Sequence, residues 1–219
     1  MKLQLTHLHP EFDRLQEKHG AGGLCGIYGA GCTENPRVCF VFMNPTGKNV
    51  SSAKSWKGLK APWIGTKNTW KLFNAVGVIS DATLADILLR KPENWNYDVA
   101  ESVYRELAGN GVYVTNLGKC TQCDAAHVGD AVFREYLPLL EREIAEIKPG
   151  LVIAFGNQVS SILLGMPVKV SEMRKKIMTR NGVKFMPVYY PVGQGMRNIA
   201  LAIEDIKLGL NESNKRSAK

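Results

Sequence analysis

Asn44, Asn116 and Asn157 each follow a short run of apolar residues, at the point where a loop or a helical pattern begins. An asparagine side chain presents a hydrogen-bond donor beside an acceptor, and this pairing matches the polar edge of a nucleobase. Asparagine also starts turns and caps helices, which requires no ligand. We favour the capping role for Asn157, which precedes a helical pattern, and keep both interpretations open for Asn44 and Asn116.

A basic segment with interleaved tryptophans follows the first of these asparagines. Positions 48–71 hold no acidic residue and six lysines, at Lys48, Lys54, Lys57, Lys60, Lys67 and Lys71. Lysines that face phosphates give sequence-independent, salt-sensitive affinity for nucleic acids, and tryptophan rings stack on bases. The formal net charge of +8 also favours a polyanionic partner, although many soluble proteins are merely basic. We expect a polyanionic partner, with Lys48 and Lys67 among the residues that contact it.

The composition is that of an ordinary globular protein. The 219 residues are 45% hydrophobic and 22% charged, which argues against a disordered chain. No stretch is long and apolar enough to cross a membrane, and the first residues lack the apolar centre of a signal peptide. We therefore expect a cytoplasmic, nucleoid-associated monomer. We expect a single domain over residues 1–210 and a mobile polar tail over 211–219.

Apolar runs alternate with helical patterns along the chain. Strands are expected at 38–43, 112–115, 151–155 and 183–189, and Asn181-Gly182 predicts a hairpin turn whose first arm is 176–179. Helices are expected at 1–20, 66–76, 81–90, 98–108, 130–147, 157–164 and 197–208. This alternation predicts a three-layer α/β/α fold with a central, mostly parallel four-stranded sheet. Ligands of such sheets bind beyond the carboxyl ends of the strands, where Asn44 and Asn116 are expected to lie.

Five motifs occur in a fixed order on these elements. They are Phe42-Met43-Asn44-Pro45-Thr46-Gly47, Ala61-Pro62-Trp63-Ile64-Gly65, Thr115-Asn116-Leu117-Gly118-Lys119-Cys120, Val152-Ile153-Ala154-Phe155-Gly156 and Tyr190-Pro191-Val192-Gly193-Gln194-Gly195-Met196-Arg197-Asn198. In this order, residues 36–208 resemble the uracil-DNA glycosylase superfamily. The first motif is most similar to the mismatch-specific and single-strand-selective branches, which carry asparagine there. The Thr-Asn and Lys-Cys segment is more similar to the iron–sulfur branches.

The resemblance implies excision of uracil or a related deaminated base from DNA, as in base excision repair. It places Met43, Pro45, Trp63 and Asn116 around the flipped base, with Trp63 stacking on the ring and Asn116 reading the Watson–Crick edge. Asn44 stands where the family often has a catalytic aspartate. Being neutral, its amide can orient a water molecule but cannot act as a strong base.

Tyr190 stands where the family usually carries a histidine that stabilises the departing base. A phenol can donate the same hydrogen bond, so we assign Tyr190 a catalytic role beside Asn44. Gln194 or Met196 is expected to fill the gap left by the flipped nucleotide, and Arg197 to contact a phosphate. The missing histidine keeps open a catalytically weak or inactive nucleic-acid-binding protein on the same fold. An unrelated small-molecule enzyme with coincidental motifs is the remaining alternative.

The cysteines raise the question of a cofactor. Cys120 and Cys123 have the spacing of metal ligands, and Cys25 and Cys32 lie in the N-terminal loop where the iron–sulfur branches place two ligands. Those branches place a fourth cysteine on the following helix, and residues 133–140 contain none. We expect no cofactor, and an iron–sulfur cluster or zinc held by these four thiolates is the alternative.

Overall fold

The central strands of the sheet are formed by apolar residues that are buried on both faces. In the computed structural model, which describes residues 5–217 apart from the side chains of residues 194 and 214–217, six strands form one sheet in the order β1-β3-β2-β4-β6-β5. The strands are β1 (Ala30–Gly31), β2 (Val38–Phe42), β3 (Val112–Asn116), β4 (Val152–Phe155), β5 (Met178–Arg180) and β6 (Val183–Val188). Every residue of β2, β3 and β4 is buried, as expected for parallel strands covered on both sides.

The four strands expected from the sequence make up the parallel centre of the sheet, β3-β2-β4-β6. Two further strands pair antiparallel at its edges. β5 is the first arm of the expected hairpin and pairs with β6, whereas β1 pairs with β3 and lies in a segment expected to be a loop. The predicted mostly parallel α/β fold is therefore confirmed, with a sheet of six strands rather than four.

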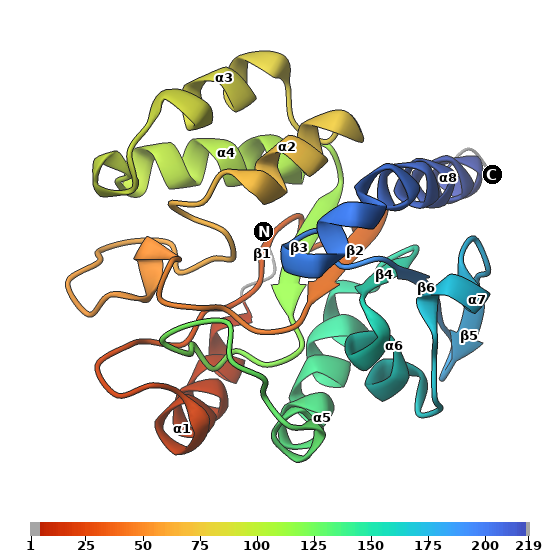
Figure 1. Cartoon of the computed structure of the whole chain (residues 1–219), viewed down its shortest axis with the longest axis horizontal. Helices are drawn as coiled ribbons and strands as arrows, with labels where there is room; N and C mark the ends of the chain where they lie inside the picture. Colours follow the sequence, from red (N-terminus) through yellow and green to blue (C-terminus); the bar gives the residue numbers. More distant parts are fainter. Residues whose placement is uncertain (1–4, 218–219) are drawn as a thin grey trace.

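Helices cover both faces of the sheet (Figure 1). The longer ones are α1 (His9–His19), α2 (Asn68–Ala75), α3 (Asp81–Leu89), α4 (Tyr97–Gly109), α5 (Asp130–Ile147), α6 (Asn157–Leu164) and α8 (Ile199–Ser217). The short ones are η1 (Leu5–Leu8), η2 (Val50–Ser52), η3 (Pro92–Asn94), α7 (Val170–Met173) and η4 (Gly193–Asn198). α2, α3, α4 and α8 lie on one side of the sheet and α1, α5 and α6 on the other, which gives three layers (Figure 1).

Side chains alternate along β2, so this strand packs against helices on both faces of the sheet. Phe40 and Phe42 point to the side of α2 and α4, where Trp70 is fully buried. Cys39 points to the side of α5 and packs in a cluster with Phe133. Cys39 is fully buried and packs there as a small apolar side chain.

The last helix extends further than the sequence predicted. α8 continues to Ser217, so residues 211–217 belong to a helix where a polar tail was expected. The helix continues past Gly209 because Leu210 and Ser213 are still buried against the protein, and the Ser213 hydroxyl donates to the carbonyl of Leu210 at 2.8 Å. Within residues 5–217, no helix combines the length and the apolar character that crossing a membrane requires.

Candidate active site

The carboxyl ends of the four parallel strands meet at one edge of the sheet. Phe42, the last residue of β2, is in register with Asn116, the last residue of β3. Phe155 at the end of β4 is in register with Val188 at the end of β6, and the N–H of Gly156 donates to the carbonyl of Val188 at 2.7 Å. The loops that leave these strands therefore start side by side, as expected for ligand sites of parallel sheets.

Four aromatic rings pack together at this edge, and we call them the aromatic cluster: Phe42, Trp63, Phe155 and Tyr190. The ring of Phe42 stacks on that of Phe155, with centroids 4.2 Å apart. Trp63 meets Phe42 edge to face at 4.9 Å, and Tyr190 does so at 6.3 Å. The cluster brings together segments that are far apart in the sequence, and Trp63 and Tyr190 both contact the ring of Phe42.

Asn116 projects onto the same face of the sheet as the aromatic cluster. Side chains alternate along a strand, and two residues before Asn116 the side chain of Val114 packs in the same core as Phe42. Asn116 is 2% exposed, and its amide nitrogen Nδ2 finds no acceptor among the described residues. A buried donor without an acceptor costs about 1–3 kcal/mol, so Asn116 is arranged at an energetic cost that a bound acceptor would remove.

Trp63 is held in a strained backbone conformation. Its φ of 71° lies in the left-handed region, which bulky residues rarely adopt. Its carbonyl accepts hydrogen bonds from the Trp70 indole at 3.0 Å and from the Thr66 hydroxyl at 2.7 Å. The buried indole nitrogen of Trp63 itself has no partner within the described part of the chain. Such strain concentrates at ligand-binding positions, where the surrounding contacts enforce it.

Asn44 lies in a loop that is fastened to the loop after β3. Its Nδ2 donates to the carbonyl of Pro45 at 3.1 Å, so its Oδ1 remains to accept a hydrogen bond from a ligand or a water molecule. The same Pro45 carbonyl accepts from the N–H of Gln122 at 3.1 Å, and the carbonyl of Gln122 accepts from the N–H of Gly47 at 2.8 Å. These contacts fix the Asn44 loop in one orientation.

A cavity of about 270 Å³ opens beside Tyr190. Its lining residues come from the ends of three strands: Met43, Phe155, Gly156, Asn157, Gln158, Val159, Tyr190, Val192 and Gly195. Burial raises the pKa of Tyr190, and a hydrogen bond with the backbone of Met43 opposes this rise. The structure therefore places Met43 and Tyr190 on the cavity wall. Asn44, Trp63 and Asn116 are not among the lining residues, whereas Phe155 and Tyr190 belong both to the cavity wall and to the aromatic cluster.

Two cavity residues were not singled out from the sequence for this role. Asn157 accepts a hydrogen bond from the N–H of Val170 at 2.9 Å, so its structural role is to hold α7 rather than to cap α6. The amide of Gln158 donates to Asp130 at 2.7 Å and to the carbonyl of Val128 at 2.9 Å. Their positions on the wall follow from the turn after β4, which Gly156 and Asn157 mark in the sequence.

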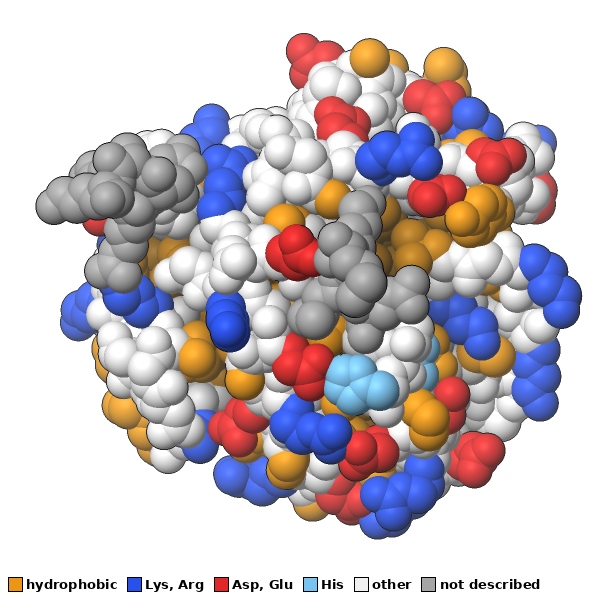
Figure 2. Space-filling view, turned by 180° about the vertical axis from the view of Figure 1, so that it is seen from behind, with side chains coloured by type: hydrophobic (Ala, Val, Ile, Leu, Met, Phe, Trp, Pro, Cys, Tyr) orange, Lys and Arg blue, Asp and Glu red, His pale blue; other side chains and the backbone are white. Residues whose placement is uncertain are grey.

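The residues expected to contact DNA lie at the surface around this edge. Lys48 and Lys67 are exposed, and Lys67 donates to the carbonyl of Leu88 at 2.6 Å. Met196 is 41% exposed and Arg197 is also exposed, both on η4. Gln194 belongs to η4, but its side chain lies outside the described residues. Basic side chains line the edge of the molecule on the side of loop 43–67 in Figure 2, which suits a phosphate backbone.

The cysteines are dispersed. Cys120 is buried in a cluster with Leu8 and Phe12, whereas Cys123 is exposed and Cys32 donates to the carbonyl of Glu34. Among residues 5–217, no group of three or more His, Cys, Asp or Glu side chains is placed to hold a metal ion. Cys120 faces the core and Cys123 faces outward, although the two residues are only three positions apart in the sequence.

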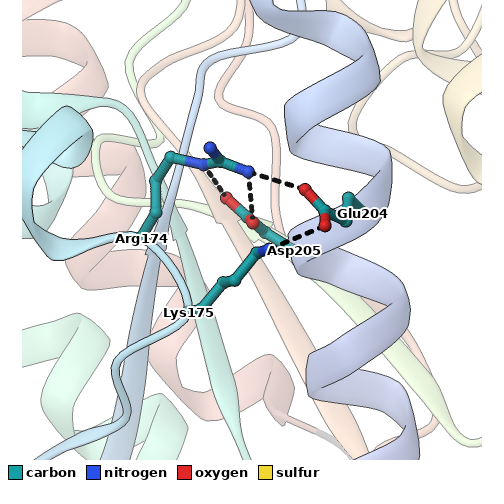
Figure 3. A network of polar contacts seen from close by, with 4 residues as sticks. All are labelled: Arg174, Lys175, Glu204 and Asp205. Atoms are coloured by element: carbon teal, nitrogen blue, oxygen red, sulfur yellow. Dashed lines mark hydrogen bonds and ion pairs between the residues drawn. The ribbon is translucent and has the colours of Figure 1, made fainter.

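A polar network anchors the helix that follows η4. Arg174 and Lys175, in the turn after α7, reach Glu204 and Asp205 on α8 (Figure 3). Arg174 forms two bonds to Asp205, at 2.8 and 2.9 Å, and Lys175 lies 2.6 Å from Glu204. Because η4 leads directly into α8, this network fixes the base of the segment that carries Met196 and Arg197.

Comparison with known proteins agrees with this arrangement. No curated protein matches the chain. The family model described as the uracil DNA glycosylase superfamily matches residues 28–204, which includes every strand of the parallel centre and all of the aromatic cluster. With this match and a site at the carboxyl edge of a parallel α/β sheet, the chain belongs to the uracil DNA glycosylase superfamily.

Proposed function

We propose that the protein is a DNA glycosylase that flips uracil or a related deaminated base out of DNA and hydrolyses its N-glycosidic bond. The observation that carries this proposal is the amide donor of Asn116, which is unpaired within the described chain. This donor is buried at a strand end, on the face of the aromatic cluster. The keto oxygen of a deaminated base is the acceptor that would satisfy it.

Base recognition uses stacking and edge reading together. Extruding a base from the duplex costs a few kcal/mol, and stacking on an aromatic ring recovers about 1–3 kcal/mol per base. Trp63 supplies that ring, since it is half-buried beside Phe42 and strained in its backbone. Asn116 then distinguishes a keto base from an amino base, because its free donor pairs with an oxygen and not with an amino group. Met43 and Pro45 supply the backbone wall beside the base.

The chemistry is cleavage of the bond between the sugar C1′ and the base nitrogen. The bonding electrons leave with the base, and the oxygen of a water molecule bonds to C1′. The proton that this water loses ends on the anionic base, which gives a sugar hydroxyl and a neutral free base. Asn44 orients the water through its free Oδ1, because its Nδ2 is committed to Pro45. Tyr190 donates a hydrogen bond to the departing anionic base, as an oxyanion-stabilising group does.

Affinity for DNA comes from the basic loop and from η4. Lys48 and Lys67 neutralise phosphates, Arg197 contacts a phosphate, and Met196 or Gln194 occupies the gap in the base stack. We propose a monomer, with a single domain bearing one such site.

The test is release of free base from oligonucleotides that contain uracil, hypoxanthine or a thymine mismatch, in single and double strands. Cleavage at the resulting abasic site gives the readout. We expect release from at least one substrate, and Asn44→Ala and Asn116→Ala each to reduce it about 100-fold, with Lys207→Ala on α8 as a control at wild-type rate. Salt-dependent DNA binding without any abasic site would instead establish the non-catalytic binding protein, which the replacement of histidine by Tyr190 favours.

A further inference from the structure

A lysine and a glutamate form an ion pair inside the protein, beside the end of β3. Lys119 is fully buried and Glu143 on α5 is 2% exposed, with 2.7 Å between Nζ and Oε2. Both residue types are almost never fully buried unless they are paired. Removing two charges from water is costly, and an apolar pair of similar volume is often as stable or more so. A contribution to the stability of the fold therefore does not explain why this buried ion pair is present.

The hydrogen bonds of the pair are saturated. Besides Glu143, the Lys119 ammonium donates to the hydroxyl of Thr115 at 2.5 Å and to the carbonyl of Asn116 at 2.7 Å. The other oxygen of Glu143 accepts from Tyr113 at 2.6 Å and from Thr115 at 2.9 Å. All three N–H donors of the ammonium group are used, so the group has one orientation. It therefore holds the side chains and the carbonyl to which it donates in fixed positions.

The surroundings seal this network against water and movement. The ring of Phe12 on α1 covers the ammonium at 5.0 Å. The backbone at Gly29 packs so closely that a Cβ there would lie 2.0 Å from the Tyr113 hydroxyl and 2.4 Å from Glu143. The network is thus a rigid polar body between α1, α5 and β3.

We propose that Lys119 is a positioning residue for base recognition, and that it acts through Asn116. This inference rests on the proposed glycosylase function. Two of the three ammonium donors bind consecutive residues at the end of β3, and one of them holds the backbone carbonyl of the residue whose side-chain amide is left without a partner among the described residues. The ion pair fixes the Asn116 peptide and thereby keeps its amide donor pointed at the base. A charged anchor has the advantage over a neutral one that its hydrogen bonds are stronger.

The closing experiment removes the charges without changing the shape. In Lys119→Met/Glu143→Gln the chain keeps similar volumes and leaves no unpaired charge, and the amide oxygen introduced at position 143 still accepts from Tyr113. We expect single-turnover base release to fall tenfold or more while the melting temperature stays close to that of the wild type. In the Asn116→Ala background the same double substitution should have no further effect, because its target is gone. The matched control is Lys18→Met/Glu135→Gln, a surface pair at 2.7 Å between α1 and α5, which should release base at the wild-type rate.

A second readout does not depend on activity. The side-chain amide NMR signals of Asn116, assigned by their loss in Asn116→Ala, should be distinct and slow to exchange in the wild type and averaged in the double variant. If the double variant does not fold, Thr115→Val replaces it, because it deletes one hydrogen bond to Lys119 and one to Glu143. Its effect on the Asn116 amide signals and on base release should be smaller and in the same direction. Unchanged amide signals and unchanged base release in the folded variant would overturn the positioning role. A wild type that releases no base from any substrate would overturn the glycosylase proposal, and then the amide signals alone decide whether Lys119 orients Asn116.

Discussion

Arg174 holds the buried carboxylate of Asp205 with two of its nitrogens, Nε at 2.8 Å from Oδ2 and Nη2 at 2.9 Å from Oδ1. The side chain of Asp205 on α8 is fully buried, and that of Arg174 is 21% exposed. We expect Arg174→Met to lower the free energy of unfolding by about 3 kcal/mol, because it leaves a buried charge without its partner. The value is at the low end of the usual range since water reaches part of the guanidinium. Urea unfolding followed by circular dichroism measures it.

The matched variant is Arg174→Met/Asp205→Leu, which removes both charges. We expect it to recover most of the lost stability, since an apolar pair replaces the ion pair. Equal destabilisation in the single and double variants would mean that the charge pair itself, rather than the orphaned carboxylate, sets the stability.

Tyr190 gives the site a pH dependence different from that of a histidine. Burial raises the pKa of its phenol above the ordinary value of 10.0, so the donor keeps its proton throughout neutral and mildly alkaline pH. We expect Tyr190→Phe to slow base release by one to two orders of magnitude, at about the same factor from pH 6 to pH 9. Tyr190→His should release base faster at acidic pH and show a step near pH 6.5, where imidazole titrates. A wild-type rate that falls steeply between pH 7 and pH 9 would contradict a phenol as the donor.

The exposed lysines of loop 43–67 should govern how DNA binding depends on salt. Each lysine that neutralises a phosphate contributes about 0.9 to the slope of log affinity against log salt concentration. Lys48→Ala/Lys57→Ala, both at exposed positions, should therefore reduce the slope by roughly 2, measured by fluorescence anisotropy on undamaged duplex. Lys207→Ala removes an exposed charge from α8 and should leave the slope unchanged. Equal effects of these variants would point to net charge rather than to a contact surface.

The reactivity of the thiols distinguishes the dispersed cysteines from a metal site. Burial raises the pKa of Cys39 and of Cys120, and it also shields both from reagents. In a disulfide-exchange assay at pH 8, we expect the exposed Cys123 to react first, and Cys39 and Cys120 to react only after unfolding. Cys123→Ser should abolish the fast phase. Joint protection of Cys120 and Cys123 that a chelator relieves would contradict the dispersed arrangement.

Long periodic segments could be predicted from the sequence closely. The helix expected over 130–147 is α5 (Asp130–Ile147), because an amphipathic pattern ends at a residue in the left-handed conformation followed by Pro149. β1 was missed because two residues carry no periodicity, and only the antiparallel pairing with Tyr113 and Val114 makes them a strand. The end of α8 was placed too early because Gly209 in a polar context resembles a helix stop, whereas burial of Leu210 extends the helix.

Part of the candidate site could be proposed from the sequence, and part of it could not. Asn44, Asn116 and Tyr190 could be proposed from the sequence because each lies where an apolar strand pattern ends. The pairing of Lys119 with Glu143 could not be found, since the two residues are 24 positions apart and nothing local marks either as buried. The sequence spacing of Cys120 and Cys123 suggested a joint role, but the spacing does not determine on which side of the backbone each thiol lies.

The candidate site is built from segments that lie far apart along the chain. Asn44 follows β2 and Asn116 ends β3, and these two strands pair within the first 116 residues, whereas Tyr190 follows β6, which pairs with β4 and β5. A chain shortened before the C-terminal hairpin would carry the basic loop but lack Tyr190, the group that we propose to stabilise the departing base. We therefore expect such a shortened chain to bind DNA without removing a base from it.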